Sequence, residues 1–273
     1  MVVSLFSKLV KQLLLILILV VMIFPLLWMF LISLMEPGSS LSFSNLLEAN
    51  YTLQNFSDLL NDYKIGHYLF NSIFVGLTVT IGNILFCFMV AYTLARYKSL
   101  PNKLIFISII VVLMIPAHIV IIPLYVLFMK SGMYDSYYAL ILPFLVSPIG
   151  IFLVKQYIET IPTSMEEAAR IDGASELTIL FKIVMPLCKP ALAVLSIQVF
   201  FTNWNSFLFP YILTQSDSVR TLPVALAHFQ GFQGIDWQHL MAGSVIAVLP
   251  VLILFIVLQR QIVSGITAGA IKQ

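Results

Sequence analysis

Residues 13–24 have the sequence LLLILILVVMIF, twelve consecutive apolar residues within a stretch that carries no charge from Gln12 to Met35. A helix crosses the roughly 30 Å hydrocarbon core of a bilayer with about 20 residues, so this stretch is long enough to span a membrane. Lys8 and Lys11 precede it, as in a secretory signal, but the apolar part of a signal has only about 7–15 residues. We therefore expect an uncleaved first membrane span.

The composition of the rest of the chain agrees with this interpretation. Of the 273 residues, 60% are hydrophobic and only 10% are charged, whereas soluble domains have about 25% charged residues. A soluble protein with this surplus would expose large apolar patches, which is rare, and disordered chains are poor in apolar residues. The chain is thus predicted to be an integral membrane protein in which lipid covers the apolar surface.

Charge and cysteine content exclude several other classes. The net charge is only +2, which gives no reason to expect a nucleic-acid partner. Cys87 and Cys188 lie far apart in apolar segments and match no metal-binding spacing. We expect buried, inert thiols and no metal site.

The hydropathy pattern predicts an all-α integral membrane protein with six transmembrane helices. The expected spans cover residues 9–35, 69–95, 104–129, 137–157, 190–213 and 240–259. Several spans contain prolines, among them Pro116 and Pro210. Neighbouring helices can satisfy the backbone groups that a proline frees within a membrane, so kinked spans are tolerated.

The basic residues predict the orientation of these spans. If the amino terminus is cytoplasmic, eleven of the 14 Lys and Arg residues lie on the inside, and only Lys64, Lys130 and Arg220 lie outside. The eleven are Lys8, Lys11, Arg96, Lys98, Lys103, Lys155, Arg170, Lys182, Lys189, Arg260 and Lys272. This asymmetry is typical of multi-pass proteins and puts both termini in the cytoplasm. The expected location is a plasma membrane of the prokaryotic type.

The expected organisation has three parts. Residues 1–68 form the first transmembrane helix and an extracellular loop, and residues 69–262 form a transmembrane core with a long cytoplasmic loop at 159–187. Residues 263–273 form a cytoplasmic tail.

The loop at 159–187 predicts a short helix, a turn and a second helix. Thr163 with Glu166, and Ser164 with Glu167, each have the spacing of a capping box, so a helix should begin there. Gly173 should end it, because glycine adopts the positive φ of a helix C-terminus most easily.

The second helix is expected over about 176–184. Ser175 should cap its start, and Pro186 should end it. Glu166 and Arg170, four residues apart, should support the first helix. An alternative role for this helical pair is an amphipathic segment that only rests on lipid.

A family resemblance adds to this picture. Glu167-Ala168-Ala169, Gly173 and the run Ile-Val-Met-Pro at 183–186 resemble the EAA loop of permease subunits in ABC importers, whose pattern ends Ile-x-Leu-Pro. The longer string EAARIDGA at 167–174 resembles the carbohydrate, maltose-permease branch. AYTLAR at 91–96, NWN at 203–205 and GITAG at 265–269 are also similar to that branch. The resemblance covers residue 68 to the C-terminus.

The resemblance implies a type I ABC-importer transmembrane domain that couples to ATPase subunits through this loop. The residues that it assigns to ATPase coupling are Glu166, Glu167, Ala168, Ala169, Asp172 and Gly173. It implies four kinds of partner: a second homologous permease, two ATP-binding cassette subunits, an extracellular or periplasmic solute-binding protein, and membrane lipid. In relatives the C-terminal tail also touches the ATPases, which makes residues 265–273 a second expected contact.

The chain itself is expected to be no enzyme and to need no cofactor. It contains no GxxxxGK[ST] string, the loop that cradles nucleotide phosphates, so ATP and Mg would be bound by the partner subunits. The expected solute is a sugar or oligosaccharide. Two alternatives stay open: the same machinery for another solute such as glycerol phosphate, or a secondary transporter or channel.

Polar residues inside the spans are candidates for the solute pathway, because intramembrane polar groups face the bundle interior or a wet cavity. The candidates are Asn83, Gln198, Asn203 and Asn205. The alternative role is interhelical hydrogen bonding, at about 0.6–2 kcal/mol each. The outer loop at 214–239, rich in Phe, Gln and Gly, is expected to dock on a binding protein, although Trp237 also fits an interfacial aromatic belt.

Overall fold

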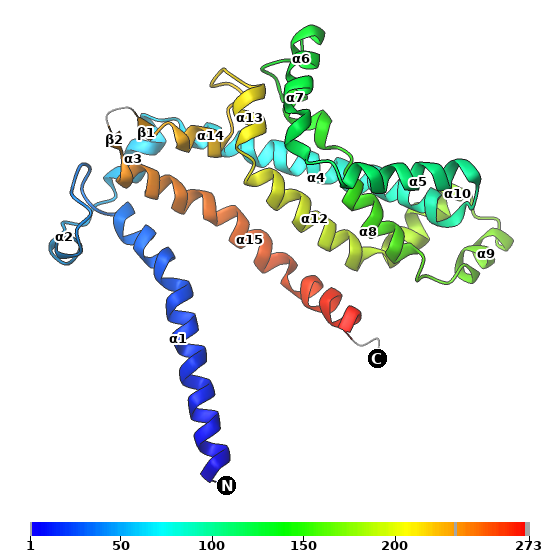
Figure 1. Cartoon of the computed structure of the whole chain (residues 1–273), viewed down its shortest axis with the longest axis horizontal. Coiled ribbons are helices and arrows are strands. Elements are labelled where there is room, and N and C mark those ends of the chain that lie inside the picture. Colours follow the sequence, from blue (N-terminus) through cyan, green and yellow to red (C-terminus); the bar gives the residue numbers. More distant parts are fainter. Residues whose placement is uncertain (1, 232–233, 271–273) are drawn as a thin grey trace. The chain divides into compact units, whose positions relative to one another are not determined.

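The structure is a computed structural model that describes residues 2–231 and 234–270 (Figure 1). The chain divides into two compact units, Met1–Gly66 with Ala225–Pro250, and His67–Val224 with Val251–Gln273.

The first unit joins the amino-terminal helix to the outer loops. Its elements are α1 (Val2–Ser33), α2 (Phe43–Glu48), α3 (Gln54–Asn61), the antiparallel strands β1 (Gln230–Gly231) and β2 (Gly234–Ile235), and the beginning of α15 (Trp237–Ala270). Asn55 of α3 is fully buried and donates to the carbonyl oxygens of Ser33 at 2.9 Å and Met35 at 2.7 Å. These two bonds hold the end of α1 against α3.

The second unit contains the remaining helices. They are α4 (Ile65–Arg96), α5 (Leu100–Leu113), η1 (Ala117–Val120), α6 (Ile121–Ser131), α7 (Tyr137–Ile141), η2 (Leu142–Phe144), α8 (Pro148–Ile158), α9 (Ser164–Ile171), α10 (Glu176–Thr178), the π-helical η3 (Ile179–Val184), α11 (Met185–Leu187), α12 (Lys189–Trp204), α13 (Leu208–Leu213) and α14 (Leu222–Ala227). α4 begins, and α14 ends, in the first unit.

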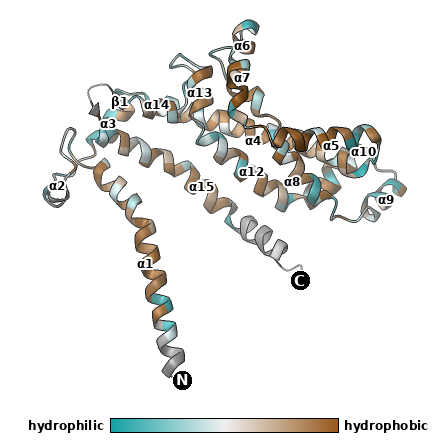
Figure 2. Ribbon diagram, in the orientation of Figure 1, coloured by the Kyte–Doolittle hydropathy of each residue, from teal (hydrophilic) through white to brown (hydrophobic). Residues whose placement is uncertain are grey.

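The length and composition of these helices agree with the predicted membrane protein. Among the described residues, four helical segments can each cross a bilayer: Val10–Ser33, Ile65–Arg96, Tyr137–Ile158 and Trp237–Val257. Two bent pairs raise the number to six if each pair is one span, namely Leu100–Leu113 with Ala117–Ser131, and Glu176–Leu187 with Lys189–Trp204. Figure 2 shows the apolar residues that run along α1 and α15, and the hydrophilic residues around α2 and α9.

The third and fifth expected spans are bent or broken and are not single straight helices. The third bends by 95° between Leu113 and Ala117, because Pro116 lacks an amide donor and disfavours helical dihedral angles in the residue before it. The fifth begins on the far side of a 78° bend at Cys188. Its helix ends at Trp204, and α13 starts only at Leu208. Pro25 and Pro250, in contrast, lie inside continuous helices.

The core of the second unit lies between α4, α8, α12 and the loop helices. Its buried residues include Phe88, Val154 and Leu195 as well as both cysteines, which are fully buried as expected. At Gly150 of α8 an added Cβ would lie 2.9 Å from Leu195 Cδ1 and 3.1 Å from Cys87 Sγ. This glycine therefore lets α8 approach both α4 and α12.

Candidate functional site

The helix that carries the EAA pattern, α9, begins where the sequence predicts but without the predicted caps. Thr163 precedes α9 with helical dihedral angles, and its side chain makes no capping hydrogen bond. The amide groups of Glu166 and Glu167 instead donate to the Thr163 carbonyl at 2.9 and 3.0 Å. Ser164 is already the first helical residue, so neither capping box forms, since a cap needs extended dihedral angles.

The end of α9 confirms the predicted glycine turn. Gly173 has a φ of +81°. Its amide donates to the Arg170 carbonyl at 3.1 Å, and the Ala174 amide donates to the Ala169 carbonyl at 2.9 Å. This pair of bonds is the Schellman motif, which satisfies the last carbonyl groups of a helix.

The second helix of the loop starts as predicted and ends later. The Ser175 hydroxyl accepts the Thr178 amide at 3.3 Å and caps α10. Pro186 does not end the helix, which continues through η3 and α11 to Leu187. Pro186 lies at the point where the wider turn of the π-helical η3 gives way to α11.

Glu166 is the buried member of the acidic pair on α9, with 2% of its surface exposed. Its Oε1 accepts from Arg96 Nε at 2.7 Å, and its Oε2 accepts from the Tyr92 hydroxyl at 2.9 Å. The predicted partner, Arg170, lies 3.9 Å away and bonds Glu176 at 2.7 Å instead. Glu166 is therefore held mainly by the cytoplasmic end of α4.

The other residues assigned to coupling divide between two faces of α9. Ala169 is buried in the core of the second unit, whereas Glu167, Ala168, Asp172 and Gly173 are exposed. Three apolar side chains near them are also exposed: Met165 at 46%, Ile171 at 87% and Leu177 at 69%. Exposed apolar side chains grouped in this way mark an interaction surface. We call Met165, Glu167, Ala168, Ile171 and Asp172 the outward face of α9.

Asn83 of α4 bonds within the fold. It is 1% exposed, its Nδ2 donates to the Phe144 carbonyl at 2.9 Å, and its Oδ1 accepts from the Ser147 hydroxyl at 3.1 Å. These bonds pair the Phe144 carbonyl and the Ser147 hydroxyl in the segment between η2 and α8. Asn83 therefore has the arrangement expected for interhelical hydrogen bonding, the alternative to a place in the solute pathway.

The three candidates at 198–205 lie on different sides of the chain. Gln198 and Asn205 are exposed, together with Thr202 and Phe201. The spacing of residues 198, 201, 202 and 205 puts them on one face of a helix. At the end of this face, Asn205 Nδ2 donates to the Phe201 carbonyl at 2.8 Å. We call Gln198, Phe201, Thr202 and Asn205 the polar face of α12.

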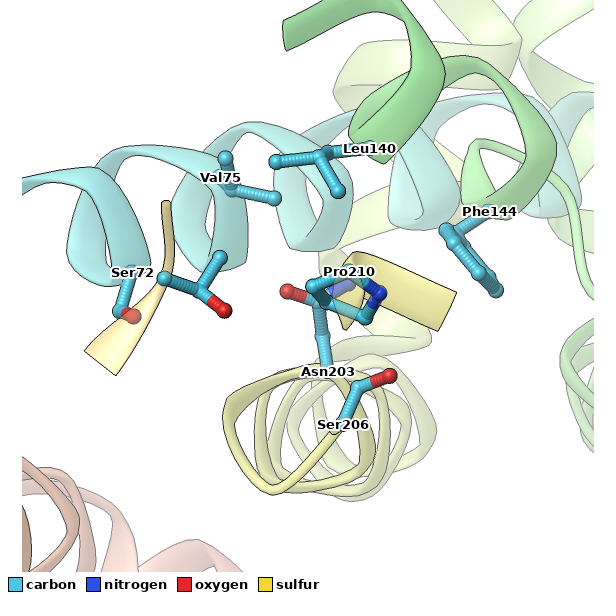
Figure 3. A pocket seen from close by; sticks show the side chains of 8 residues that line it. Ser72, Val75, Leu140, Phe144, Asn203, Ser206 and Pro210 are labelled. Atoms are coloured by element: carbon cyan, nitrogen blue, oxygen red, sulfur yellow. The ribbon is translucent and has the colours of Figure 1, made fainter. Parts of the chain in front are cut away.

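Asn203 points instead toward α4 and lines a small cavity (Figure 3). The cavity is lined by Ser72, Val75, Leu140, Phe144, Asn203, Ser206, Pro210 and Thr221. The buried hydroxyl of Thr221 has no hydrogen-bond partner among the described residues. The cavity volume of about 10 Å³ admits about one water molecule and no sugar. The structure therefore does not bring the four predicted pathway residues together.

A polar network that the sequence did not predict holds the first part of the outer loop. Asp135 has a φ of +54°, and its Oδ1 accepts the amide groups of Gln215 at 2.8 Å and Ser216 at 2.9 Å. Asn71 Nδ2 donates to the carbonyl oxygens of Ser218 and Arg220 at 3.1 and 2.9 Å. Partial burial acts to raise the pKa of Asp135, but the two amide donors, the Ser216 side chain and the nearby charge of Arg220 together outweigh it and hold this pKa below its usual value.

The remainder of the outer loop belongs to the first unit. There the hairpin β1–β2 exposes Gln230 and Ile235, and Trp237 at the start of α15 is 37% exposed. Residues 232 and 233, which are part of the expected docking loop, lie outside the described residues. The expected cytoplasmic tail continues α15 as a helix to Ala270, and its residues 271–273 lie outside them as well.

Comparison with known proteins identifies the family. Residues 83–268 match the family described as the binding-protein-dependent transport system inner membrane component. The chain belongs to this family. It is a permease subunit of the inner membrane, and the alternative of a secondary transporter or channel is thereby overturned.

Similar proteins cover nearly the whole chain. The arabinooligosaccharides transport system permease protein AraQ of Halalkalibacterium halodurans is 36% identical, over 92% of this chain and 91% of the relative. The trehalose/maltose transport system permease protein MalG of Thermococcus litoralis is 34% identical, over 93% and 92%. A crystal structure of a bacterial ABC transporter that imports alginate matches with a TM-score of 0.81 at 23% identity, over 93% and 96% of the two chains. That similarity shows the type I importer fold of the permease subunit.

Proposed function

We propose that this chain is one half of the translocation pathway of an ATP-driven importer for a sugar or oligosaccharide. Relatives that are 34–36% identical bear names that refer to arabinooligosaccharides and to trehalose or maltose. A second homologous permease supplies the other half of the pathway, and a solute-binding protein delivers the solute from outside.

The outward face of α9 is the observation that carries the coupling part of this proposal. It combines an apolar residue that is 87% exposed, Ile171, with the carboxylates of Glu167 and Asp172. An amphipathic helix that rests on the inner leaflet would favour basic residues, because that leaflet is negatively charged. A protein cleft with an apolar floor and a basic rim fits this face better.

The ATPase subunits would supply that cleft. Two of them bind ATP and Mg, since the sequence of this chain has no phosphate-binding GxxxxGK[ST] loop. Closure of the ATPase dimer displaces α9, and the displacement moves the membrane helices between inward- and outward-facing arrangements. This chain contributes the coupling helix and half of the pathway.

The polar face of α12 supports a neutral, hydroxyl-rich solute. It offers two amides and a hydroxyl beside the ring of Phe201, which are groups that hydrogen-bond and stack on sugars. Residues 198–205 contain no Lys or Arg, whereas a phosphate group is usually bound by basic side chains. This difference favours a sugar over glycerol phosphate as the solute.

The experiment that tests the proposal is reconstitution with partners. The tagged chain is co-expressed with a homologous permease, the ATPase and the binding protein, and the purified complex is placed in vesicles. We expect co-purification of the ATPase, and ATP hydrolysis that rises when binding protein and its sugar are added. A chain that brings down no ATPase, or hydrolysis that ignores the loaded binding protein, would contradict the proposal.

A matched pair of variants sharpens this experiment. Glu167→Lys reverses a charge on the outward face of α9, whereas Glu159→Lys reverses a half-exposed charge at the end of α8. We expect only Glu167→Lys to prevent ATPase binding while the protein still inserts into the membrane.

A further inference from the structure

A buried cluster of three side chains connects α9 to α4. Arg96 is the last residue of α4, and its Nε lies 2.7 Å from Glu166 Oε1. The side chains of Arg96 and Glu166 are only 10% and 2% exposed. Tyr92, one helical turn earlier in α4, donates its hydroxyl to the second carboxylate oxygen at 2.9 Å. Both oxygens of Glu166 are thus bound by the same helix.

Arg96 also holds the chain segment that leads into α9. Its Nη2 donates to the Ile161 carbonyl at 3.0 Å, just before the turn from which α9 begins. One guanidinium group therefore binds both the approach to α9 and the first turn of α9 itself. Hydrogen bonds between charged groups are shorter and stronger than neutral ones. A buried ion pair also resists separation, because either group would be left charged without a partner away from water.

The connection from α9 to the next helix is of a different kind. It passes through Gly173, where the chain has a left-handed conformation and an added Cβ would meet nothing within 4 Å. The ion pair across this turn, Arg170–Glu176, has side chains that are 41% and 54% exposed. Exposed pairs of this sort contribute little stabilisation. The structure thus combines a firm attachment of α9 to α4 with a solvent-exposed turn toward α10.

We propose that Arg96 is a positioning residue that fixes α9 to the cytoplasmic end of α4, so that the two helices move as one body during transport. This inference rests on the proposed coupling to ATPase subunits. A displacement of the outward face of α9 by an ATPase then passes directly to α4, which is a candidate membrane span of 32 residues. Arg96 and Glu166 act through the position of α9, and not by contact with the ATPase.

The first test removes the charge of Glu166 with little change of shape. Complexes that contain Glu166→Gln are reconstituted in vesicles with both ATPase subunits and the binding protein, and the solute transported per ATP hydrolysed is measured. We expect this ratio to fall about fivefold or more, at the lower end of known coupling strengths, while ATPase binding is retained. The exchanged pair Arg96→Glu with Glu166→Arg keeps an ion pair between α4 and α9 but loses the bonds to Ile161 and Tyr92, so it should restore part of the loss.

A control at the same end of the unit separates this role from general stabilisation. Lys155 and Glu159 form an ion pair of the same 2.7 Å length, with Lys155 at 10% exposure, but it joins residues of α8 and its C-terminal cap only. Glu159→Gln should leave the transport ratio unchanged. An unchanged ratio in Glu166→Gln, an equal loss in Glu159→Gln, or no recovery in the exchanged pair would overturn the inference.

A covalent bridge tests the motion directly and does not depend on whether Glu166→Gln folds well. Arg96→Cys and Glu166→Cys are combined with Cys87→Ala and Cys188→Ala, and the two new thiols are joined by a short bifunctional reagent. If α4 and α9 move together, the bridged complex still transports. Loss of transport in a bridged complex that still binds ATPase would show that the helices must separate, which overturns the inference. Failure of the unmodified chain to bind any ATPase would instead refute the proposed function.

Discussion

Replacement of Gly173 by alanine should weaken ATPase binding by an amount that the geometry of the turn defines. The φ of Gly173 is +81°, and an added Cβ would meet nothing within 4 Å. The substitution therefore adds no steric contact, and its cost is the left-handed backbone alone. For residues with a side chain this conformation costs roughly 1–2 kcal/mol, which corresponds to about a 5–30-fold change in an equilibrium constant.

The assay is the affinity of the detergent-solubilised chain for its ATPase. We expect Gly173→Ala to bind about 5–30-fold more weakly. The bound loop must keep the left-handed turn at residue 173, whereas the free loop can leave this conformation and so avoid the strain. Asparagine tolerates this conformation better than alanine, so Gly173→Asn should lose less. Gly173→Pro should not bind at all, since proline fixes φ near −65°.

Gly132 provides the matched control for this series. It has a φ of +70°, also with nothing within 4 Å of an added Cβ, but it ends α6, far along the chain from α9. Gly132→Ala introduces the same kind of strain and should leave ATPase affinity unchanged. Equal affinity of Gly173→Ala and the unmodified chain, or an equal loss in Gly132→Ala, would refute the assignment of this turn to coupling.

Three further predictions concern packing, pH and charge. Gly150→Ala should lower the free energy of unfolding by about 1–3 kcal/mol through overpacking, which thermal unfolding would measure. Gly76→Ala is the control and should have a smaller effect, because its Cβ would meet only Phe200 Cε2 at 3.1 Å and atoms farther away. The pKa of Asp135 is held below its usual value. The Asp135 carboxylate should therefore contribute its full stabilisation above the usual aspartate pKa, and this stabilisation should disappear as the pH falls through the lowered pKa. Asp135→Asn should flatten this part of a stability–pH curve. Glu167→Gln should weaken ATPase binding less than Glu167→Lys in a pull-down, because it removes an attraction without adding a repulsion, and equal effects would contradict a basic rim on the partner.

Features set by local sequence were predictable. The apolar runs predicted the membrane class and six spans, because the bilayer fixes the length of a spanning helix; the described helices provide four spans, or six if each bent pair is one span. The turn at Gly173 and the cap at Ser175 follow from spacing over a few residues, whereas α9 starts where predicted but without either predicted cap. The family resemblance located the EAA loop, which the match over residues 83–268 includes.

Features set by distant neighbours were not predictable from these patterns. Glu166 was expected to pair with Arg170 one turn away, but its main partner Arg96 lies 70 residues earlier in the chain. The AYTLAR string at 91–96 contains Tyr92 and Arg96, two of the three residues of this cluster. Nothing in the string indicates that they bind Glu166.

Distant neighbours also decide the effect of each proline and the surroundings of each polar residue. Pro116 breaks a span whereas Pro25 does not, because the outcome depends on which neighbours satisfy the freed backbone groups. Asn83 and Gln198 are equally polar in sequence, yet Asn83 is buried by its partners on the following helices and Gln198 is exposed.

The most direct test of the account is a crosslink from the outward face of α9. Ile171→Cys, at a position that is 87% exposed, is coupled to a photoactivatable reagent in membranes that also contain the ATPase. Tyr138→Cys, at a position that is 63% exposed and expected on the outer side, is the control. We expect an adduct with the ATPase from position 171 and none from position 138. Adducts with lipid alone from position 171 would contradict it.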